Sequence, residues 1–176
     1  MSAAVKKELM EWVSSILIAV ILAFVIRVYV FEFIQVIGIS MVPTLKNHDW
    51  LLVEKISYRF RDPQRGDIII LKNPGNLKEN FVKRVIGVEN DVIEVRDGYV
   101  YVNQERIEEP YINEQAMDDF PAVIVPEDSY FVMGDNRNRS KDSRDPGVGF
   151  IPREDLLGRA VLRIWPLQSI RWFGGV

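Results

Sequence analysis

The sequence predicts an all-β or β-rich domain preceded by one N-terminal transmembrane helix. Three observations indicate this fold class. A long apolar run lies near the N-terminus, many short β-branched segments with turn residues between them follow it, and no sustained helical period occurs after the apolar run. A chain of 176 residues has room for one domain of ordinary size and a small appendage.

The apolar run Trp12–Phe33 predicts a membrane-spanning helix, because about 20 apolar residues cross the hydrocarbon core of a bilayer. Lys6 and Lys7 precede the run, and basic residues favour the cytoplasmic side. We therefore expect residues 1–33 to form a cytoplasmic N-terminus and a single-pass anchor in the plasma membrane. Residues 34–176 are expected to form an extracytoplasmic domain.

The apolar run has two other interpretations. A cleaved secretory signal has a shorter apolar core and small residues at its cleavage site. Bulky residues, Tyr29, Phe31 and Phe33, stand at the end of this run, which favours an uncleaved anchor. A buried core helix remains an alternative, because Arg27 lies within the run.

The rest of the chain is typical of short strands separated by turns. Asp97-Gly98 between Val92–Arg96 and Tyr99–Val102 predicts a tight β-hairpin. The polar, acidic stretch Arg106–Asp119 predicts an inserted excursion, and Pro152–Leu157 predicts a short helix. The other expected strands are Trp50–Ile56, Arg65–Leu71, Phe81–Val88, Ala122–Val125, Ser129–Gly134 and Gly158–Leu167.

Composition excludes several classes of site. The net charge is −3 with both signs interspersed and no basic stripe, so no nucleic-acid partner is expected. The absence of cysteine excludes disulfides, thiolate zinc sites and cysteine nucleophiles. The one histidine, His48, lies in the polar turn "KNHDW" and is interpreted as a surface residue. No metal and no cofactor are expected.

Ser40 is a candidate nucleophile within "GISMVPTL", Gly38 to Leu45. Serine is common in turns, so an ordinary turn serine is the more frequent interpretation of such a segment. A serine nucleophile needs a base, and the candidates are His48 and a lysine.

Lys83 is the candidate base. In a strand it would share a face with Phe81 and Val85, where burial would lower the pKa of its amine and allow it to accept a proton. Most lysines in strands are exposed, however. Periodicity alone does not decide which face is buried, because the opposite face carries Val82, Arg84 and Ile86.

The stretch "VMGDNRNRSKDSRDPGVGF", residues 132–150, is dense in small and charged residues. A solvated loop is the ordinary interpretation. Because the stretch follows an apolar strand, it also suits a buried, hydrogen-bonded support. Ser140 and Ser143 are candidates to position a lysine amine, and Asp142 and Arg144 are candidates for an ion pair.

Four blocks together resemble the type I signal peptidases of bacteria. They follow the apolar run in the order "GISMVPTL", "RGDIIIL", "FVKRVIG" and "GDNRNRSKDSRDPGVGFIPREDLLGRA". The resemblance extends from the apolar run to about Trp165. It implies a partly barrel-like catalytic domain in which Ser40 is the nucleophile, Lys83 is the general base and Ser140 hydrogen-bonds the lysine amine.

The resemblance also implies supporting roles. Asp142 and Arg144 would form a supporting pair, and Asp135, which follows Gly134 at the start of the last block, would pair with Arg84. Some members of the family carry a serine or threonine where this chain has Gly38, so the oxyanion here would rely on the backbone N–H of Ser40. Met41 is expected to line the substrate site or to contact lipid.

The implied function is that of a membrane-anchored serine endopeptidase that removes signal peptides from exported preproteins. Few residues separate Phe33 from Ser40, which keeps the nucleophile within roughly 25 Å of the end of the membrane span. One alternative is a self-cleaving Ser/Lys protease, which the anchor argues against. Another is a catalytically inactive membrane-bound scaffold, which the joint presence of Ser40, Lys83 and Ser140 argues against.

Overall fold

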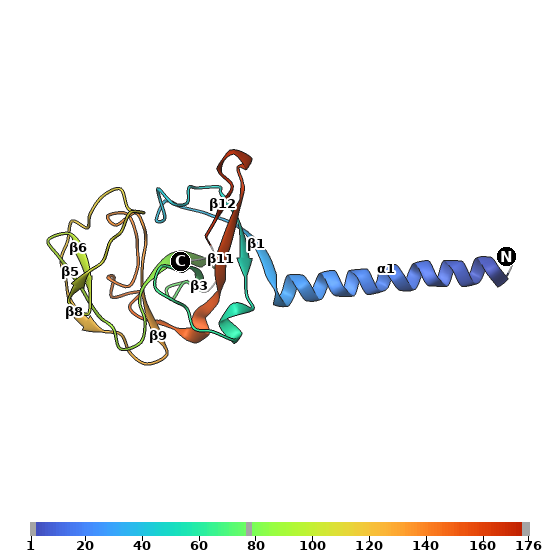
Figure 1. Ribbon diagram of the computed structural model, residues 1–176, viewed down its shortest axis with the longest axis horizontal. Coiled ribbons are helices and arrows are strands. Elements are labelled where there is room, and N and C mark those ends of the chain that lie inside the picture. The colour runs from blue at the N-terminus through green and yellow to red at the C-terminus, as the bar shows by residue number, and fades with distance from the viewer. Residues whose placement is uncertain (1–2, 77–78, 174–176) are drawn as a thin grey trace.

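A long N-terminal helix projects from a β-rich body (Figure 1). The computed structural model describes residues 3–76 and 79–173, so the outermost residues of the two expected parts lie outside the described residues. Helix α1 spans Ala3–Tyr29, and the segment Val5–Tyr29 is long and apolar enough to cross a membrane. None of this segment is buried in the structure, so the alternative of a buried core helix is wrong.

The helix ends before the apolar run does. Strand β1, Phe31–Gln35, pairs antiparallel with β2, Trp50–Glu54. Glu32 forms an ion pair with Lys55 at 2.6 Å, which gives this charged residue a partner at the edge of the sheet. The prediction that the membrane-spanning helix extends to Phe33 is therefore wrong for its last residues. Phe31–Phe33 belong to β1, because aromatic residues favour strands and these residues pair with β2.

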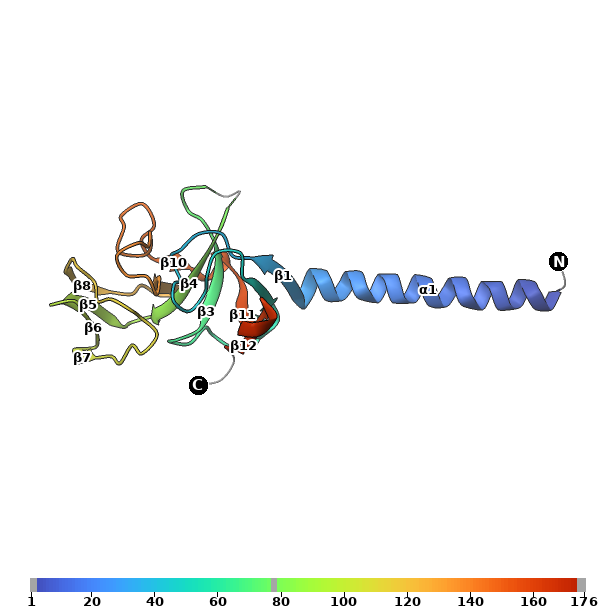
Figure 2. The same cartoon turned by 90° about the horizontal axis from the view of Figure 1, so that it is seen from above.

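The body contains two antiparallel sheets. The larger sheet has the order β1-β2-β11-β3-β4-β9-β10, with β12 paired to β11, and it curls into a partly closed barrel (Figures 1 and 2). Its other strands are β3 (Ile68–Lys72), β4 (Asn80–Gly87), β9 (Ser129–Met133), β10 (Ile151–Pro152), β11 (Leu156–Trp165) and β12 (Arg171–Trp172). The mostly β, partly barrel-like fold expected from the sequence is confirmed.

The smaller sheet lies at the end of the body away from α1 (Figures 1 and 2). Its order is β7-β6-β5-β8, and its strands are β5 (Val92–Arg96), β6 (Tyr99–Val102), β7 (Glu105–Arg106) and β8 (Phe120–Ile124). The hairpin prediction is confirmed, since Asp97 and Gly98 between β5 and β6 have φ of +53° and +82°, as a type I′ turn requires.

Two sequence expectations differ from the observed elements. The excursion expected at Arg106–Asp119 is a connection between β7 and β8 of the four-stranded smaller sheet. The inserted part of the chain is therefore this whole sheet and is larger than the polar stretch. The expected helix at Pro152–Leu157 is a single 3-10 turn, Arg153–Asp155, because Leu156 already begins β11. Two further 3-10 turns lie at Ser57–Arg59 and Leu167–Ser169.

Apolar clusters hold the two sheets and the loop after β1 together. The Phe131 ring of β9 lies between Phe120 of the smaller sheet and Phe150, with ring centroids 5.4 and 6.1 Å apart. Met41 and Leu45 from the loop after β1 are buried among the larger sheet's side chains. The buried side chains of Met41 and Leu45 therefore fix the loop on the sheet, and Ser40 in the same loop stays partly exposed.

Candidate active site

Ser40 and Lys83 meet between the loop after β1 and the centre of β4. The Lys83 Nζ atom lies 2.9 Å from Ser40 Oγ, within hydrogen-bond distance. Lys83 pairs in register with Ile69 of β3, and its side chain is only 3% exposed, whereas Ser40 is partly exposed. The fold thus joins an accessible hydroxyl to a buried amine from a distant part of the chain.

Burial dominates the electrostatics of Lys83. The Phe81 ring lies 4.7 Å from its Nζ atom, and Val85 is fully buried on the same strand. Desolvation lowers the pKa of Lys83 from 10.5 to about 8, although the charges of Asp142 and Asp135 act in the opposite direction. A substantial fraction of the amine is therefore neutral at mildly alkaline pH.

The backbone of the Ser40 loop is bound by the segment after β9. The N–H of Asn136 donates to the Ser40 carbonyl at 3.0 Å, and its side-chain amide donates to the Ile39 carbonyl at 3.1 Å. At Gly134 a Cβ atom would lie 2.4 Å from the Ser40 carbonyl oxygen and 2.3 Å from Ser140 Oγ. Only glycine permits this close approach of the two segments.

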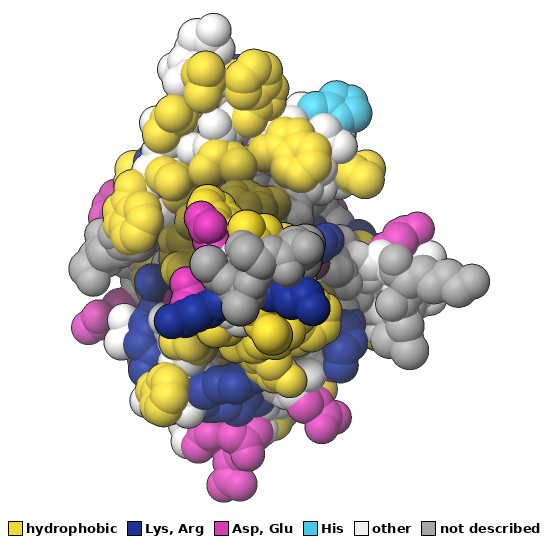
Figure 3. Space-filling model, turned by 90° about the vertical axis from the view of Figure 1, so that its right-hand side faces the viewer, with side chains coloured by type: hydrophobic (Ala, Val, Ile, Leu, Met, Phe, Trp, Pro, Cys, Tyr) yellow, Lys and Arg dark blue, Asp and Glu magenta, His cyan; other side chains and the backbone are white. Residues whose placement is uncertain are grey.

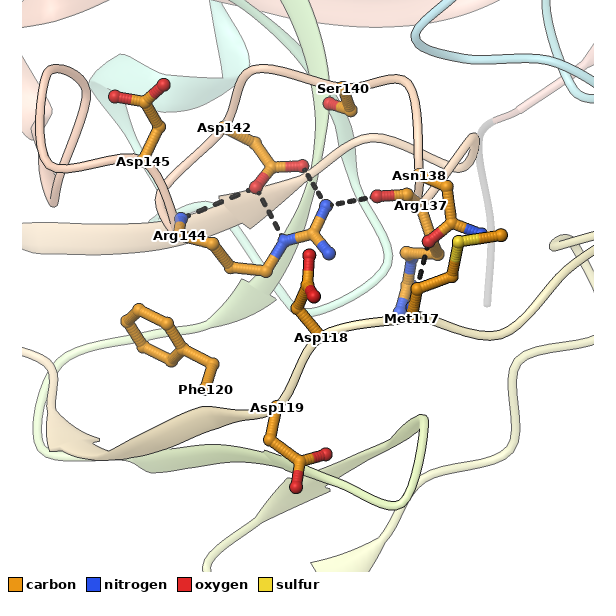
Figure 4. A pocket seen from close by; sticks show the side chains of 10 residues that line it. All are labelled: Met117, Asp118, Asp119, Phe120, Arg137, Asn138, Ser140, Asp142, Arg144 and Asp145. Carbon is orange, nitrogen blue, oxygen red and sulfur yellow. Dashed lines mark hydrogen bonds and ion pairs between the residues drawn. The ribbon is translucent and has the colours of Figure 1, made fainter.

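Asp142 and Arg144 form a double ion pair below this segment. Nε and Nη2 of Arg144 each lie 2.9 Å from a carboxylate oxygen of Asp142, as the dashed lines in Figure 4 show. Asp142 also accepts a hydrogen bond from the Gly134 N–H at 3.0 Å. The pair therefore supports the same backbone that approaches Ser40.

Asp135 and Arg84 form a second double ion pair on the other face of β4. Nε and Nη2 of Arg84 lie 2.8 and 2.6 Å from the two carboxylate oxygens of Asp135. Both side chains are buried, with relative exposures of 8% and 1%. Arg84 and Lys83 point to opposite faces, and both faces of β4 are covered, which is why strand periodicity did not distinguish them.

Ser140 does not make the hydrogen bond expected from the sequence. Its Oγ atom is buried and has no hydrogen-bond partner among the described residues, while the Lys83 amine contacts Ser40. The bond to the lysine that the resemblance implied is therefore absent in this structure. Figure 4 shows Ser140 beside Asp142 on the wall of a cavity of about 310 Å³.

Gly38 and Met41 differ in burial, since Gly38 is exposed and Met41 is buried. Gly38 has φ of +108°, in the region that favours glycine, and its N–H donates to the Asn47 side chain at 2.9 Å. Met41 is 1% exposed and packs in the core with Leu45 and Leu51. The expectation that Met41 lines the substrate site or contacts lipid is wrong, because the chain turns inward at this residue.

His48 lies in the turn before β2. It is exposed, its φ is +69°, and its backbone N–H donates to the Val36 carbonyl at 2.8 Å. The surface turn expected from the sequence is therefore present. The Ser40 hydroxyl contacts Lys83, which leaves the lysine as the base that the geometry favours.

Sequence reasoning missed three residues of the supporting network. Arg137, Glu109 and Tyr111 are joined by hydrogen bonds, and the Arg137 and Glu109 side chains are 0% and 6% exposed. Arg137 lies in the block that carried the family resemblance. Nothing local in the polar stretch singles out Glu109 or Tyr111, because their partners lie on distant segments.

Comparison with protein families gives a match over most of the chain. Residues 9–165 match the family described as signal peptidase, peptidase S26. The chain is similar to a probable signal peptidase I-2 of Synechocystis sp., with 46% identity covering 86% of this chain and 71% of that protein. It is also 41% identical to signal peptidase I P of Bacillus subtilis subsp. natto, with 94% of each chain covered.

A solved structure is similar as well. The crystal structure of a signal peptidase I from Enterococcus faecalis V583 aligns with a TM-score of 0.52 and 34% sequence identity. The alignment covers 57% of this chain and 98% of that one. The β-rich fold is therefore shared with a solved signal peptidase I.

Proposed function

The chain belongs to the signal peptidase family, peptidase S26, and from that premise we propose that it cleaves signal peptides with Ser40 as nucleophile and Lys83 as general base. The chain is thus a peptidase, a hydrolase of exported-protein precursors. The observation that carries the assignment of the two residues is the 2.9 Å contact between the buried Lys83 amine and Ser40 Oγ.

The proposed reaction begins with the neutral amine of Lys83. It accepts the proton of the Ser40 hydroxyl as the oxygen attacks the scissile carbonyl carbon. The resulting ammonium then donates its proton to the amine of the departing mature protein, leaving an acyl-enzyme. A water molecule, deprotonated by the same amine, attacks the ester and releases the signal peptide with its new carboxyl group. The backbone N–H of Ser40 is the proposed oxyanion donor, since Gly38 has no side chain to supply one.

The proposed mechanism needs both buried carboxylates, Asp135 and Asp142, to be paired with arginines. An unpaired Asp135 or Asp142 beside Lys83 would stabilise its ammonium form and keep the amine protonated. Arg84 and Arg144 each bind both oxygens of one carboxylate and offset its negative charge. We therefore assign Gly134, Asp135, Asp142 and their arginines as support for the catalytic pair.

We propose that α1 anchors the protein in the plasma membrane, with Lys6 and Lys7 on the cytoplasmic side and the β-rich body outside. Seen along α1, apolar side chains of the helix and of the body gather on this side of the molecule, most densely in the upper part of the view (Figure 3). Trp50 and Trp165, which pair across β2 and β11, are both exposed. Tryptophan favours the membrane interface, so this face would rest against the lipid headgroups and bring Ser40 to membrane-tethered preproteins.

Preproteins with small residues before the cut are the proposed substrates, because export signals end in small residues. The test is cleavage of such a preprotein by the purified protein in detergent, compared with Ser40→Ala and with Ser169→Ala as a matched serine control. We expect Ser40→Ala to abolish processing and Ser169→Ala to retain it.

The two rival functions give different results in the same assay. A self-cleaving protease would cut its own chain and leave the preprotein intact. An inactive scaffold would cleave neither. Processing by Ser40→Ala at the rate of the unmodified protein would exclude Ser40 as the nucleophile.

A further inference from the structure

The connection between β7 and β8 contributes two side chains to the network beside the catalytic pair. The Tyr111 ring lies 3.8 Å from the guanidinium carbon of Arg84, in a stacked cation–π contact. The Tyr111 hydroxyl donates to a carboxylate oxygen of Glu109 at 2.8 Å. Glu109 in turn accepts hydrogen bonds from both terminal nitrogens of Arg137. One short segment of the smaller sheet thus binds two buried arginines.

Arg84 connects Tyr111 to the surroundings of Lys83, its neighbour on β4. The Arg84 guanidinium has three sets of partners: the Asp135 carboxylate, the Gly66 carbonyl at 2.9 Å and the Tyr111 ring. Asp135 is almost fully buried, and its charge raises the pKa of Lys83. The position of the guanidinium therefore determines how much of this negative charge acts on the lysine.

Arg137 connects Glu109 to the segment that binds Ser40. Its Nε atom donates to the Gly134 carbonyl at 3.1 Å, and it follows Asn136, whose N–H binds the Ser40 carbonyl. A buried guanidinium that loses its carboxylate must find other partners or admit water. Loss of Glu109 would therefore disturb the backbone on which the nucleophile depends.

Two ion pairs supply the charges that act on Lys83. Asp142 with its partner Arg144 comes from the loop after β9. Asp135 with its partner Arg84 comes from the same loop and from β4. A change that loosens either arginine from its carboxylate should stabilise the ammonium form of the lysine.

We propose that Tyr111 and Glu109 are positioning residues for the catalytic pair. Tyr111 holds Arg84 against its carboxylate, and Glu109 holds Arg137 beneath the loop of the nucleophile. The inference rests on the proposed role of Lys83 as general base. With these roles, the connection between β7 and β8 of the smaller sheet supports the active site.

The test is the pH dependence of kcat/KM on a short peptide for the full-length protein in detergent. Tyr111→Leu removes the stacked ring and should move the acid limb upward by about half to one pH unit, because a less neutralised Asp135 favours protonated Lys83. Tyr111→Phe keeps the ring and should retain the unmodified profile. Tyr101→Leu is the matched control, since Tyr101 stacks on Arg96 at 4.3 Å within the hairpin of the smaller sheet.

Glu109→Gln provides a second, independent variant. It keeps the shape of the side chain but removes the charge paired with Arg137. We expect kcat to fall about tenfold, with KM changed less, because the nucleophile loop is displaced. Thermal melting of each variant separates this effect from unfolding.

The outcomes distinguish the positioning role from a structural one. An unchanged acid limb in folded Tyr111→Leu, or an equal shift in Tyr101→Leu, would overturn the inference. If Tyr111→Leu does not fold, the kcat of Glu109→Gln decides, and if neither variant folds the residues are structural and the inference fails. An unmodified protein without an acid limb near pH 8 would instead overturn the proposed role of Lys83 itself.

Discussion

Apolar side chains are exposed on the N-terminal helix and form a buried core in the β-rich body. Every residue from Val5 to Tyr29 is exposed in the chain, whereas Leu45, Ile69 and Phe131 of the body are fully buried. The body encloses its own core and also holds Ser40 and Lys83. This difference fits the proposed function, in which the body carries out catalysis and the helix holds the protein at a membrane.

The largest expected effect comes from changing Lys83, the proposed base, within the body. Lys83→Arg should lower kcat/KM at least about a thousandfold on peptides and preproteins alike, because a guanidinium stays protonated and cannot accept the proton of Ser40. Steady-state rates on both substrates measure this effect. Lys72→Arg, at a partly exposed lysine on neighbouring β3, is the matched control and should remain active. Activity retained by Lys83→Arg would remove the lysine from the mechanism.

The pH profile of the unmodified protein also tests whether the β-rich body supplies a lysine base. Because the pKa of Lys83 is lowered to about 8, its neutral fraction rises as pH increases through that value. We expect the rate on a short peptide to rise about fifty-fold between pH 6 and pH 8 and then to level off. A rate that stays flat from pH 5 to 10 would contradict a lysine base.

Deletion of residues 1–29 tests the proposed role of α1 as a membrane anchor. The cut falls before β1 and leaves Val30, whose carbonyl accepts a hydrogen bond from the Lys55 N–H. We expect the peptide rate to stay within about twofold, and the rate on membrane-bound preproteins to fall about tenfold or more, because the anchor confines enzyme and substrate to one surface. An equal loss on both substrates would mean that α1 belongs to the catalytic fold.

The smallest expected effect concerns the one histidine. His48 is exposed in a turn and belongs to neither the core nor the proposed catalytic pair. His48→Ala should change kcat/KM by less than about twofold, as is usual for surface substitutions away from a site. A thousandfold loss in the same peptide assay would point back to a histidine base.

Local signals in the sequence determined the elements that depend on neighbouring residues. The length of the apolar run predicted α1, and Asp97-Gly98 predicted the β5–β6 hairpin, because each depends on a contiguous stretch. The family resemblance pointed to Ser40 and Lys83 as the proposed catalytic pair, and to the residues of the two ion pairs that the structure contains. It did not predict where α1 ends, since Phe31 and Phe33 are apolar enough for a helix and become strand residues only by pairing with β2.

The sequence by itself therefore determined the mostly β class, the long apolar helix and the identity of the candidate catalytic residues. The tertiary structure decided which groups touch. It buried both faces of β4, turned Met41 into the core, left Ser140 without its expected partner and joined Glu109 to Arg137. These outcomes depend on contacts between segments far apart in the chain, and the period of a single strand or loop carries no information about them.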